Sequence, residues 1–273
     1  MKRRLPIILV LLLVCSQSKA SYITQFPGAR AWSLANAGLT FSDVFSVNNN
    51  QAGLGFLKQF TAGIYSERRF RLAELQNGCL VLAVPTSTGV WGLNLNYFGY
   101  SAYNEQQIGL AYGRAFTAKF SAGIKLNFHS VNIQEYGSKS SFTVEGGMLA
   151  KISEQLSFAA HIANPNQVKL SSYQNERIPT RGKLGLTYRP SSKVLLVMEA
   201  EKTLSSSLII KTGIAYKVRN DLELRLGIAT NPVLNCYGFG YTQKCFQLDV
   251  AASFHPQFGL TPHLSIIYKQ KAK

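Results

Sequence analysis

The residue types that most often carry chemistry are sparse in this chain. Its 273 residues include four histidines and four cysteines: His129, His161, His255, His263, Cys15, Cys79, Cys236 and Cys245. None has the CxxC or HExxH spacing of a metal site, and the GxSxG and GxxxxGK[ST] motifs are absent. His129 and His161 fall near segment ends, with Asp249 further along, yet nothing places a serine nucleophile beside them. We therefore expect no catalytic residue, no metal and no cofactor.

The N-terminus has the pattern of an export signal. Basic residues Lys2–Arg4 precede an apolar run, Leu5–Val14, and a small, polar stretch that ends at Ala20. This order predicts a secretory signal peptide over 1–20. The apolar run is shorter than the ~20 residues of a spanning helix, so a retained anchor is the weaker interpretation. The residues before Cys15 lack the small side chains that lipoprotein cleavage prefers.

The chain is strongly basic. It has 29 Lys and Arg against 13 Asp and Glu, a net charge of +16, and subtracting the four basic residues of the signal leaves about +12. Export argues against nucleic acid, so an anionic lipid surface, lipopolysaccharide in particular, is the expected partner. Arg68, Arg69 and Arg71 fall in one expected loop, where guanidinium groups could bind phosphates. A merely solvated basic loop is the alternative.

From Gln59 onward, apolar and polar residues alternate. In "KFSAGIKLNFHSV", 119–131, the even positions from 120 to 128 are apolar and most of the odd positions are polar, as on a β-strand with two different faces. Similar segments of about ten residues, long enough to cross a bilayer when tilted, follow one another along the chain. We place fourteen of them at 59–67, 77–85, 90–99, 104–115, 119–131, 140–151, 155–163, 179–188, 193–202, 207–217, 221–230, 234–241, 244–254 and 262–270.

The connections and faces of these segments favour a transmembrane antiparallel up-and-down β-barrel. Tight turns alternate with longer loops at 67–76, 132–139 and 164–178, and many Tyr and Phe residues lie near segment ends. A large soluble periplasmic β-sandwich is the alternative. If the apolar face meets lipid, the charged residues on the other face line the lumen and can pair there: Lys125, Glu145, Lys183, Glu199, Glu201, Lys211, Glu223, Arg225 and Asp249.

Two local features bear on the wall. Gly146 and Gly147 interrupt a strand, so they either kink it or allow close packing. With a turn at Thr242-Gln243, Cys236 and Cys245 would lie too far apart to form a disulfide, and we expect free thiols.

Residues 21–58 do not alternate. The stretch is rich in small residues and suits one or two short helices joined by a turn at Asn48-Asn49-Asn50. We expect it to form a periplasmic plug or hatch in the mouth of the barrel, with the barrel itself at 59–273.

Both ends of the chain resemble one family. Gly28-Ala29-Arg30-Ala31, Ala37-Gly38 and Asn50-Gln51-Ala52-Gly53-Leu54 resemble the "GARA…GGAG…NPAGL" opening of FadL-like outer-membrane barrels, especially their PorV/PorQ branch in Bacteroidetes-type bacteria. The C-terminal "FQLDVAASFHPQFGLTPHLSIIY" is similar to the same branch. The resemblance departs at Gln51, where the family usually has Pro, and at Pro262.

The resemblance implies a fourteen-stranded barrel of the bacterial outer membrane. It implies a part in type IX-like protein secretion, or in handling cargo proteins at the cell surface, through loops 67–76, 132–139 and 164–178. The alternative is a FadL-like channel for hydrophobic small molecules, with an apolar pocket under the outer loops and a lateral opening in the wall. A structural barrel that only binds surface lipid is a third possibility.

Overall fold

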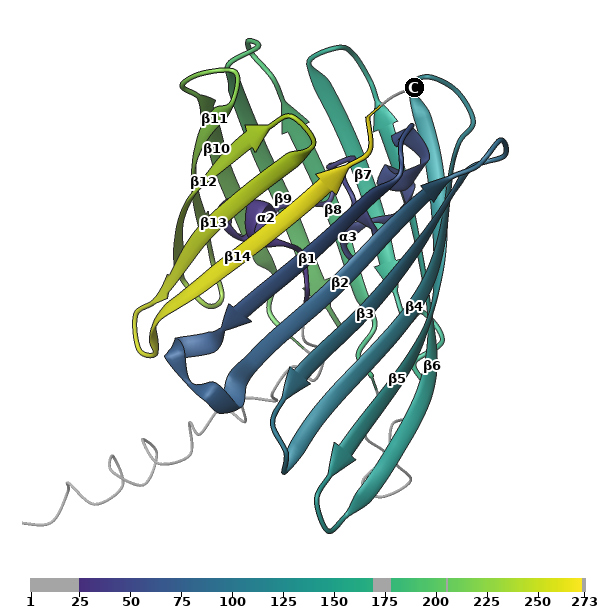
Figure 1. Ribbon diagram of the computed structural model, residues 1–273, viewed down its shortest axis with the longest axis vertical. Coiled ribbons are helices and arrows are strands. Elements are labelled where there is room, and N and C mark those ends of the chain that lie inside the picture. The colour runs from purple at the N-terminus through teal and green to yellow at the C-terminus, as the bar shows by residue number, and fades with distance from the viewer. Residues whose placement is uncertain (1–24, 169–177, 205, 272–273) are drawn as a thin grey trace, which may run out of the picture.

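The chain forms one closed antiparallel β-barrel in the computed structural model, which describes residues 25–168, 178–204 and 206–271. Each strand pairs with its neighbours in sequence, and β1 pairs with β14 to close the cylinder (Figure 1). The strands are β1 (Thr61–Arg68), β2 (Gln76–Pro85), β3 (Val90–Gly99), β4 (Tyr103–Ala115), β5 (Phe120–Ile133), β6 (Gly137–Lys151), β7 (Leu156–Ala163), β8 (Arg181–Tyr188), β9 (Val194–Thr203), β10 (Ile209–Lys217), β11 (Leu222–Ala229), β12 (Leu234–Gln243), β13 (Phe246–His255) and β14 (Gly259–Lys269). Each predicted segment overlaps one strand, and the predicted barrel is confirmed.

The two faces of the wall differ as the alternation predicts. In β5, Ile124 and Leu126 are 65% and 51% exposed, whereas Lys125 between them is 2% exposed. Because successive side chains point to opposite sides, the apolar residues cover the outside and the polar residues face inward. The same exposed apolar surface recurs on the other strands, and soluble monomers rarely leave so much uncovered. The soluble-sandwich alternative is therefore wrong. No helix within the described residues is long and apolar enough to span a membrane.

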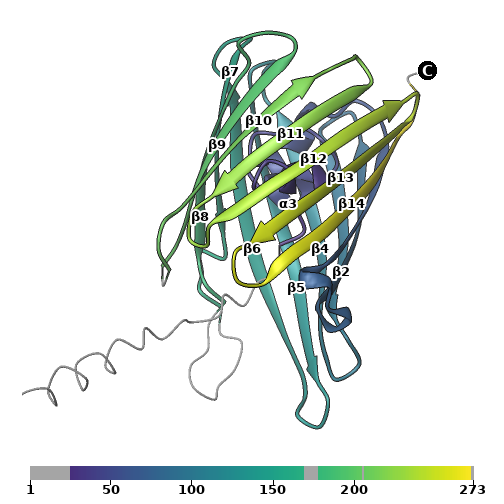
Figure 2. The ribbon, with the colours of Figure 1, turned by 90° about the vertical axis from the view of Figure 1, so that its left-hand side faces the viewer.

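The barrel has two unlike ends. At the turn end, where Thr61 pairs with Lys269, the connections between strands are short. At the loop end, a short 3-10 helical stretch, η2 (Arg69–Arg71) and η3 (Ala73–Leu75), connects β1 to β2. β5 and β6 project far beyond β7 and β8 at this end (Figure 2). The loop expected at 132–139 is shorter, because β5 continues to Ile133 and β6 begins at Gly137.

Residues 25–58 occupy the lumen, and we call them the plug (Figures 1 and 2). The plug contains helices α2 (Ala29–Trp32) and α3 (Ser46–Asn49) and the 3-10 helix η1 (Gln51–Phe56). The turn expected at Asn48-Asn49-Asn50 is wrong, because Asn48 and Asn49 belong to α3. Asn50 caps η1 instead, its side chain accepting a hydrogen bond from the Ala52 amide.

Close approach of the plug to the wall depends on glycine. A Cβ atom added to Gly123 would lie 2.5 Å from the carbonyl carbon of Gln51, inside the van der Waals contact distance. The inward-facing Gly147 meets Asn50 in the same way, while Gly146 faces open space. Both glycines stay paired with β5, so they do not interrupt β6, and only Gly147 serves close packing of the plug.

The β12–β13 register differs from the expected one. The hairpin turns at Lys244-Cys245, and Gly240 lies opposite Asp249 while Cys236 lies opposite Ser253. The expected turn at Thr242-Gln243 is wrong because both residues extend β12. The cysteines at Cys79, Cys236 and Cys245 are all free thiols.

Candidate functional site: the polar lumen and its cavity

The inward charges of β8, β9 and β10 form one buried group. The Lys211 ammonium lies 3.0 Å from Glu199 and 2.7 Å from Glu201, and Lys183 lies within 3.9 Å of both carboxylates. Arg181 adds a contact of 3.4 Å to Glu201. Both signs are present, so each carboxylate removed from water gains cationic neighbours.

The plug bonds directly to this group. The Leu39 amide donates to Glu199 over 3.2 Å, and the side-chain amide of Gln25 donates to Glu201 over 3.2 Å. The Lys211 ammonium in turn donates to the Asn36 carbonyl over 3.3 Å. The charged wall therefore holds the plug by hydrogen bonds as well as by packing.

A second group surrounds Glu145 on β6. Lys125 lies 3.9 Å from its carboxylate, His161 3.3 Å, and the Gln51 amide donates to it over 3.1 Å. Gln51 stands where the resembled family usually has Pro, and here its amide connects the plug to the wall. His129 bonds to the Thr143 hydroxyl at 2.9 Å, so it does not belong to this carboxylate's first contacts.

A third group lies towards the turn end. Arg225 contacts Glu223 and Asp249, each at 2.6 Å, and Arg30 of the plug contacts Asp43 at 3.4 Å. Burial alone would lower the pKa of Arg30, but the nearby carboxylates of Glu223, Asp43 and Asp249 outweigh it and raise that pKa above its usual value. Arg30 also lies over the Phe41 ring at 4.4 Å.

The family-motif residues serve the plug. Gly28 has φ 84°, a left-handed conformation that favours glycine, and a Cβ there would lie 2.7 Å from the Phe45 ring. Asn50 donates to the carbonyls of Leu39 and Met148, joining plug and β6. Ala52, Gly53 and Leu54 are buried, and the Ala52 carbonyl accepts from Ser121 on β5 over 2.6 Å.

The three loop arginines divide into two kinds. Arg68 and Arg71 are exposed at the loop end. Arg69 instead turns to the lumen, donating from Nε to Glu67 over 2.7 Å and lying 5.6 Å from the Phe98 ring. The structure thus does not present the three side chains as one patch.

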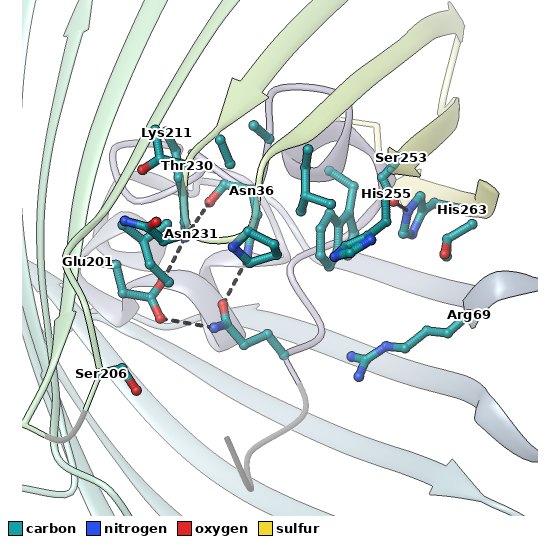
Figure 3. Close-up of a pocket in the computed structure, with 18 of the residues that line it drawn as sticks. Asn36, Arg69, Glu201, Ser206, Lys211, Thr230, Asn231, Ser253, His255 and His263 are labelled. Carbon is teal, nitrogen blue, oxygen red and sulfur yellow. Dashed lines mark hydrogen bonds and ion pairs between the residues drawn. The ribbon is translucent and has the colours of Figure 1, made fainter. Parts of the chain in front are cut away.

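Between the plug and the loop end lies a cavity of about 420 Å³, which we call the lumen cavity (Figure 3). Trp32, Ala35 and Asn36 of the plug contribute to its lining, and Glu201 and Lys211 line one part of its wall. Another part is apolar, with Phe70, Ile209 and Leu234. This size is typical of small-molecule sites, and the mixed lining suits an amphipathic or modestly hydrophobic molecule.

A group that the sequence did not predict borders the same cavity. Glu67 on β1, His263 on β14 and Ser253 on β13 face inward from three adjacent strands. The only sequence signal for these three residues is that each falls on the inward-facing positions of its alternating strand. They meet because closure of the barrel brings β1 beside β14. Within the described part of the chain, no group of three or more His, Cys, Asp or Glu residues is arranged to hold a metal ion.

Comparison with known proteins identifies the fold. No family model and no curated protein sequence matches the chain. Among solved structures, a Pseudomonas aeruginosa FadL homologue has a TM-score of 0.67 at 13% identity, covering 91% of this chain and 99% of that chain. The Ralstonia pickettii toluene transporter TbuX gives 0.70 at 10% identity, covering 92% and 100%. The monoaromatic hydrocarbon channel CymD gives 0.63 at 12% identity, covering 90% and 97%.

These likenesses extend over almost the whole of each chain, but the identities are low. They therefore concern the fold alone. The chain shares the closed antiparallel barrel fold of FadL-like proteins, and no finding favours the PorV/PorQ branch over the others.

Proposed function

We propose that this chain is a FadL-like barrel of the bacterial outer membrane that admits small hydrophobic or amphipathic molecules to its lumen. The lumen cavity is the observation that carries this proposal, since it lies under the loop end and combines apolar and polar lining. The apolar outer face of the barrel and the solved neighbours, described as a toluene transporter and a monoaromatic hydrocarbon channel, support it. A signal peptide at 1–20, which lies outside the described residues, would direct export.

The plug sets a requirement for passage. It fills the lumen below the cavity and bonds to the wall at Glu199, Glu201 and Glu145. Each described strand is hydrogen-bonded to both of its neighbours. On the route from the cavity towards the turn end, a bound molecule would therefore pass only after part of the plug moves.

The two tryptophans of the chain allow a direct binding test. Trp32 lines the cavity, and Trp91 is 45% exposed on the outer face. In a Trp91→Phe protein, titration with toluene or p-cresol should quench or shift the fluorescence of Trp32 saturably. Ala229→Phe, which adds a ring at a buried position in the cavity lining, should weaken binding at least about tenfold.

The matched control is Ile228→Phe. Ile228 is the preceding residue, 55% exposed on the outer face, so the variant should bind as the parent does. The proposal would be contradicted if neither toluene nor p-cresol bound saturably. It would also be contradicted if the Ala229→Phe and Ile228→Phe proteins bound them with equal affinity. Lipid binding alone would then favour a structural barrel.

Protein secretion is the competing proposal. Tyr136 is 87% exposed at the tip of the projecting β5–β6 hairpin and Phe258 is 60% exposed in the β13–β14 turn, so the loop end offers aromatic contacts to a cargo protein. Part of the expected 164–178 loop, residues 169–177, lies outside the described residues. Comparison of the secreted proteins of a deletion strain with wild type separates the proposals. Cargo proteins should accumulate in the periplasm of the deletion strain only if the barrel is a secretion factor.

A further inference from the structure

The Glu67, His263 and Ser253 side chains form a linear hydrogen-bonded relay. The Ser253 hydroxyl lies 2.9 Å from Nε2 of His263, and Nδ1 of the same ring lies 3.0 Å from the Glu67 carboxylate. All three residues line the lumen cavity, and Figure 3 shows Ser253 and His263 together at its border. A hydroxyl, an imidazole and a carboxylate in this order are the components of a serine nucleophile with its base.

The surrounding contacts fix the protonation pattern. Glu67 accepts from Arg69 over 2.7 Å and also from Asn77 and Tyr65, so its carboxylate has donors on both oxygens. With an ionised carboxylate at Nδ1, that nitrogen carries the imidazole proton, which it shares between Glu67 and the Tyr65 oxygen 2.9 Å away. Nε2 is then free to accept the proton of Ser253.

Packing holds the imidazole in place. The Trp32 ring stacks on the His263 ring with centroids 4.7 Å apart and planes 17° apart. His263 is 2% exposed and Ser253 is 6% exposed. The ring is therefore oriented by its hydrogen bonds on two sides and by the plug on one face, as a general base needs to be.

The other described histidines lack this arrangement. His129 bonds to a threonine hydroxyl, His161 lies between Gln51 and Glu145, and His255 accepts from the backbone amides of Gln257 and Phe258. Of the four described histidines, only His263 has a serine hydroxyl at one ring nitrogen and a carboxylate at the other. A merely polar lumen would not require that combination beside the lumen cavity.

We propose that Ser253, His263 and Glu67 form a hydrolytic site that cleaves carboxylic esters bound in the lumen cavity. Ser253 Oγ attacks the ester carbonyl while His263 Nε2 takes the hydroxyl proton. The tetrahedral intermediate collapses, the C–O bond to the alcohol breaks, and His263 returns the proton to the departing alcohol. Water, deprotonated by His263, then attacks the acyl carbon, the bond to Ser253 Oγ breaks, His263 returns the proton to that oxygen, and the carboxylic acid leaves. Glu67 holds the ring and stabilises its cation throughout.

Two N–H side chains contact the relay, Arg69 through Glu67 and Trp32 by stacking on His263. Stabilising the negative oxygen of the intermediate requires one of them to turn towards Ser253. Arg69 extends into the cavity from the wall (Figure 3). The indole N–H of Trp32 is buried and has no hydrogen-bond partner among the described residues. The apolar side chains of Phe70 and Leu234 suit a short acyl or aryl group, so the substrate class is a small, modestly hydrophobic ester.

The test uses the refolded full-length barrel in detergent, with heat-dependent gel migration to verify folding. A fluorophosphonate probe should label the protein covalently at Ser253, and p-nitrophenyl butyrate should be hydrolysed above the background rate. Ser253→Ala removes one oxygen and should abolish labelling and lower the rate at least about 100-fold. Ser141→Ala is the matched control, because Ser141 is another buried, inward serine, and its hydroxyl has no hydrogen-bond partner in the described structure.

His263→Gln and Glu67→Gln separate a relay from a lone reactive serine. Both should lower the rate strongly, and Glu67→Gln should also change its pH profile. The proposal is overturned if the folded wild type is neither labelled nor active, or if Ser253→Ala retains both. This inference shares the cavity of the proposed channel, but toluene binding without ester hydrolysis would overturn it alone.

Discussion

The ammonium group of Lys211 on β10 lies 2.7 Å from the carboxylate of Glu201 on β9, in a part of the lumen where both side chains are almost fully buried. Glu199 approaches the same nitrogen at 3.0 Å. One lysine thus contacts two carboxylates that also hold the plug, at Leu39 and Gln25.

Lys211→Met should destabilise the barrel. The change leaves two buried carboxylates whose cationic contacts are the longer ones to Lys183 and Arg181, and removal of one partner from a buried ionic group costs roughly 3 kcal/mol. Urea unfolding in detergent micelles measures the loss. Lys139→Met, at an exposed position of β6, should change the free energy of unfolding by less than about 0.5 kcal/mol. Equal free energies of unfolding for the two variants would show that Lys211 does not stabilise the barrel through Glu199 and Glu201.

Gly123→Ala should loosen the plug. The added methyl group would meet the Gln51 backbone at 2.5 Å, and backbone cannot move aside as a flexible side chain can. We expect a loss of about 1–3 kcal/mol and faster proteolysis within residues 25–58. Limited proteolysis with mass spectrometry measures the second effect.

Gly146→Ala is the control for this prediction. Gly146 is opposite Ile124 in the neighbouring strand, and its added Cβ would be no closer than 3.9 Å to the Gly123 carbonyl oxygen. The Gly146→Ala variant adds the same methyl group on the outer face of the wall. If this variant loosened the plug as much as Gly123→Ala, contact with Gln51 could not be the cause.

The sequence predicts the wall better than the lumen, for a physical reason. Alternation is local, so the opposite exposures of Ile124 and Lys125 follow from neighbouring residues alone. The contact between Glu67 and His263 requires closure of the barrel and the exact register of β1 on β14, which pairing of distant segments decides. A two-residue error in one turn, as at Lys244-Cys245, shifts every partner across that hairpin.

The plug shows the same division. Small residues and the lack of alternation predict compact, non-strand structure in residues 21–58, but they place Asn50 in a turn, whereas it caps η1. No pattern in the segment identifies Glu199 or Glu145 as its partners, because those contacts depend on how deeply the plug enters the lumen. The cavity is what remains after that packing, so it could not be placed from the sequence.

The loop arginines should separate into lipid-binding and structural residues. Arg68 and Arg71 are exposed, and we propose that they contact lipopolysaccharide phosphates. Replacing both with Gln should weaken binding to lipopolysaccharide micelles several-fold at low salt and leave unfolding unchanged. Arg69→Gln should instead lower stability by about 1 kcal/mol, because Glu67 loses a charged donor at a partly exposed site.

Polymyxin and EDTA sensitivity of cells that express each variant provides the second measurement. Only the Arg68→Gln, Arg71→Gln double variant should change it. If lipopolysaccharide binding is unchanged in that double variant, the two side chains form a solvated loop and the proposed lipid contact is wrong.

The cysteines report on the register of the last hairpins. Cys79 and Cys236 are buried on inward positions of β2 and β12, whereas Cys245 lies in the β12–β13 turn and is partly exposed. In folded protein purified without residues 1–20, a bulky maleimide should therefore label one thiol rapidly and the other two only after unfolding. Cys245→Ser should remove the rapid reaction, and Cys236→Ser should leave it unchanged. Intact-mass spectrometry counts the adducts. Rapid labelling of Cys236 would place the turn elsewhere and shift Ser253, its pairing partner, relative to β12.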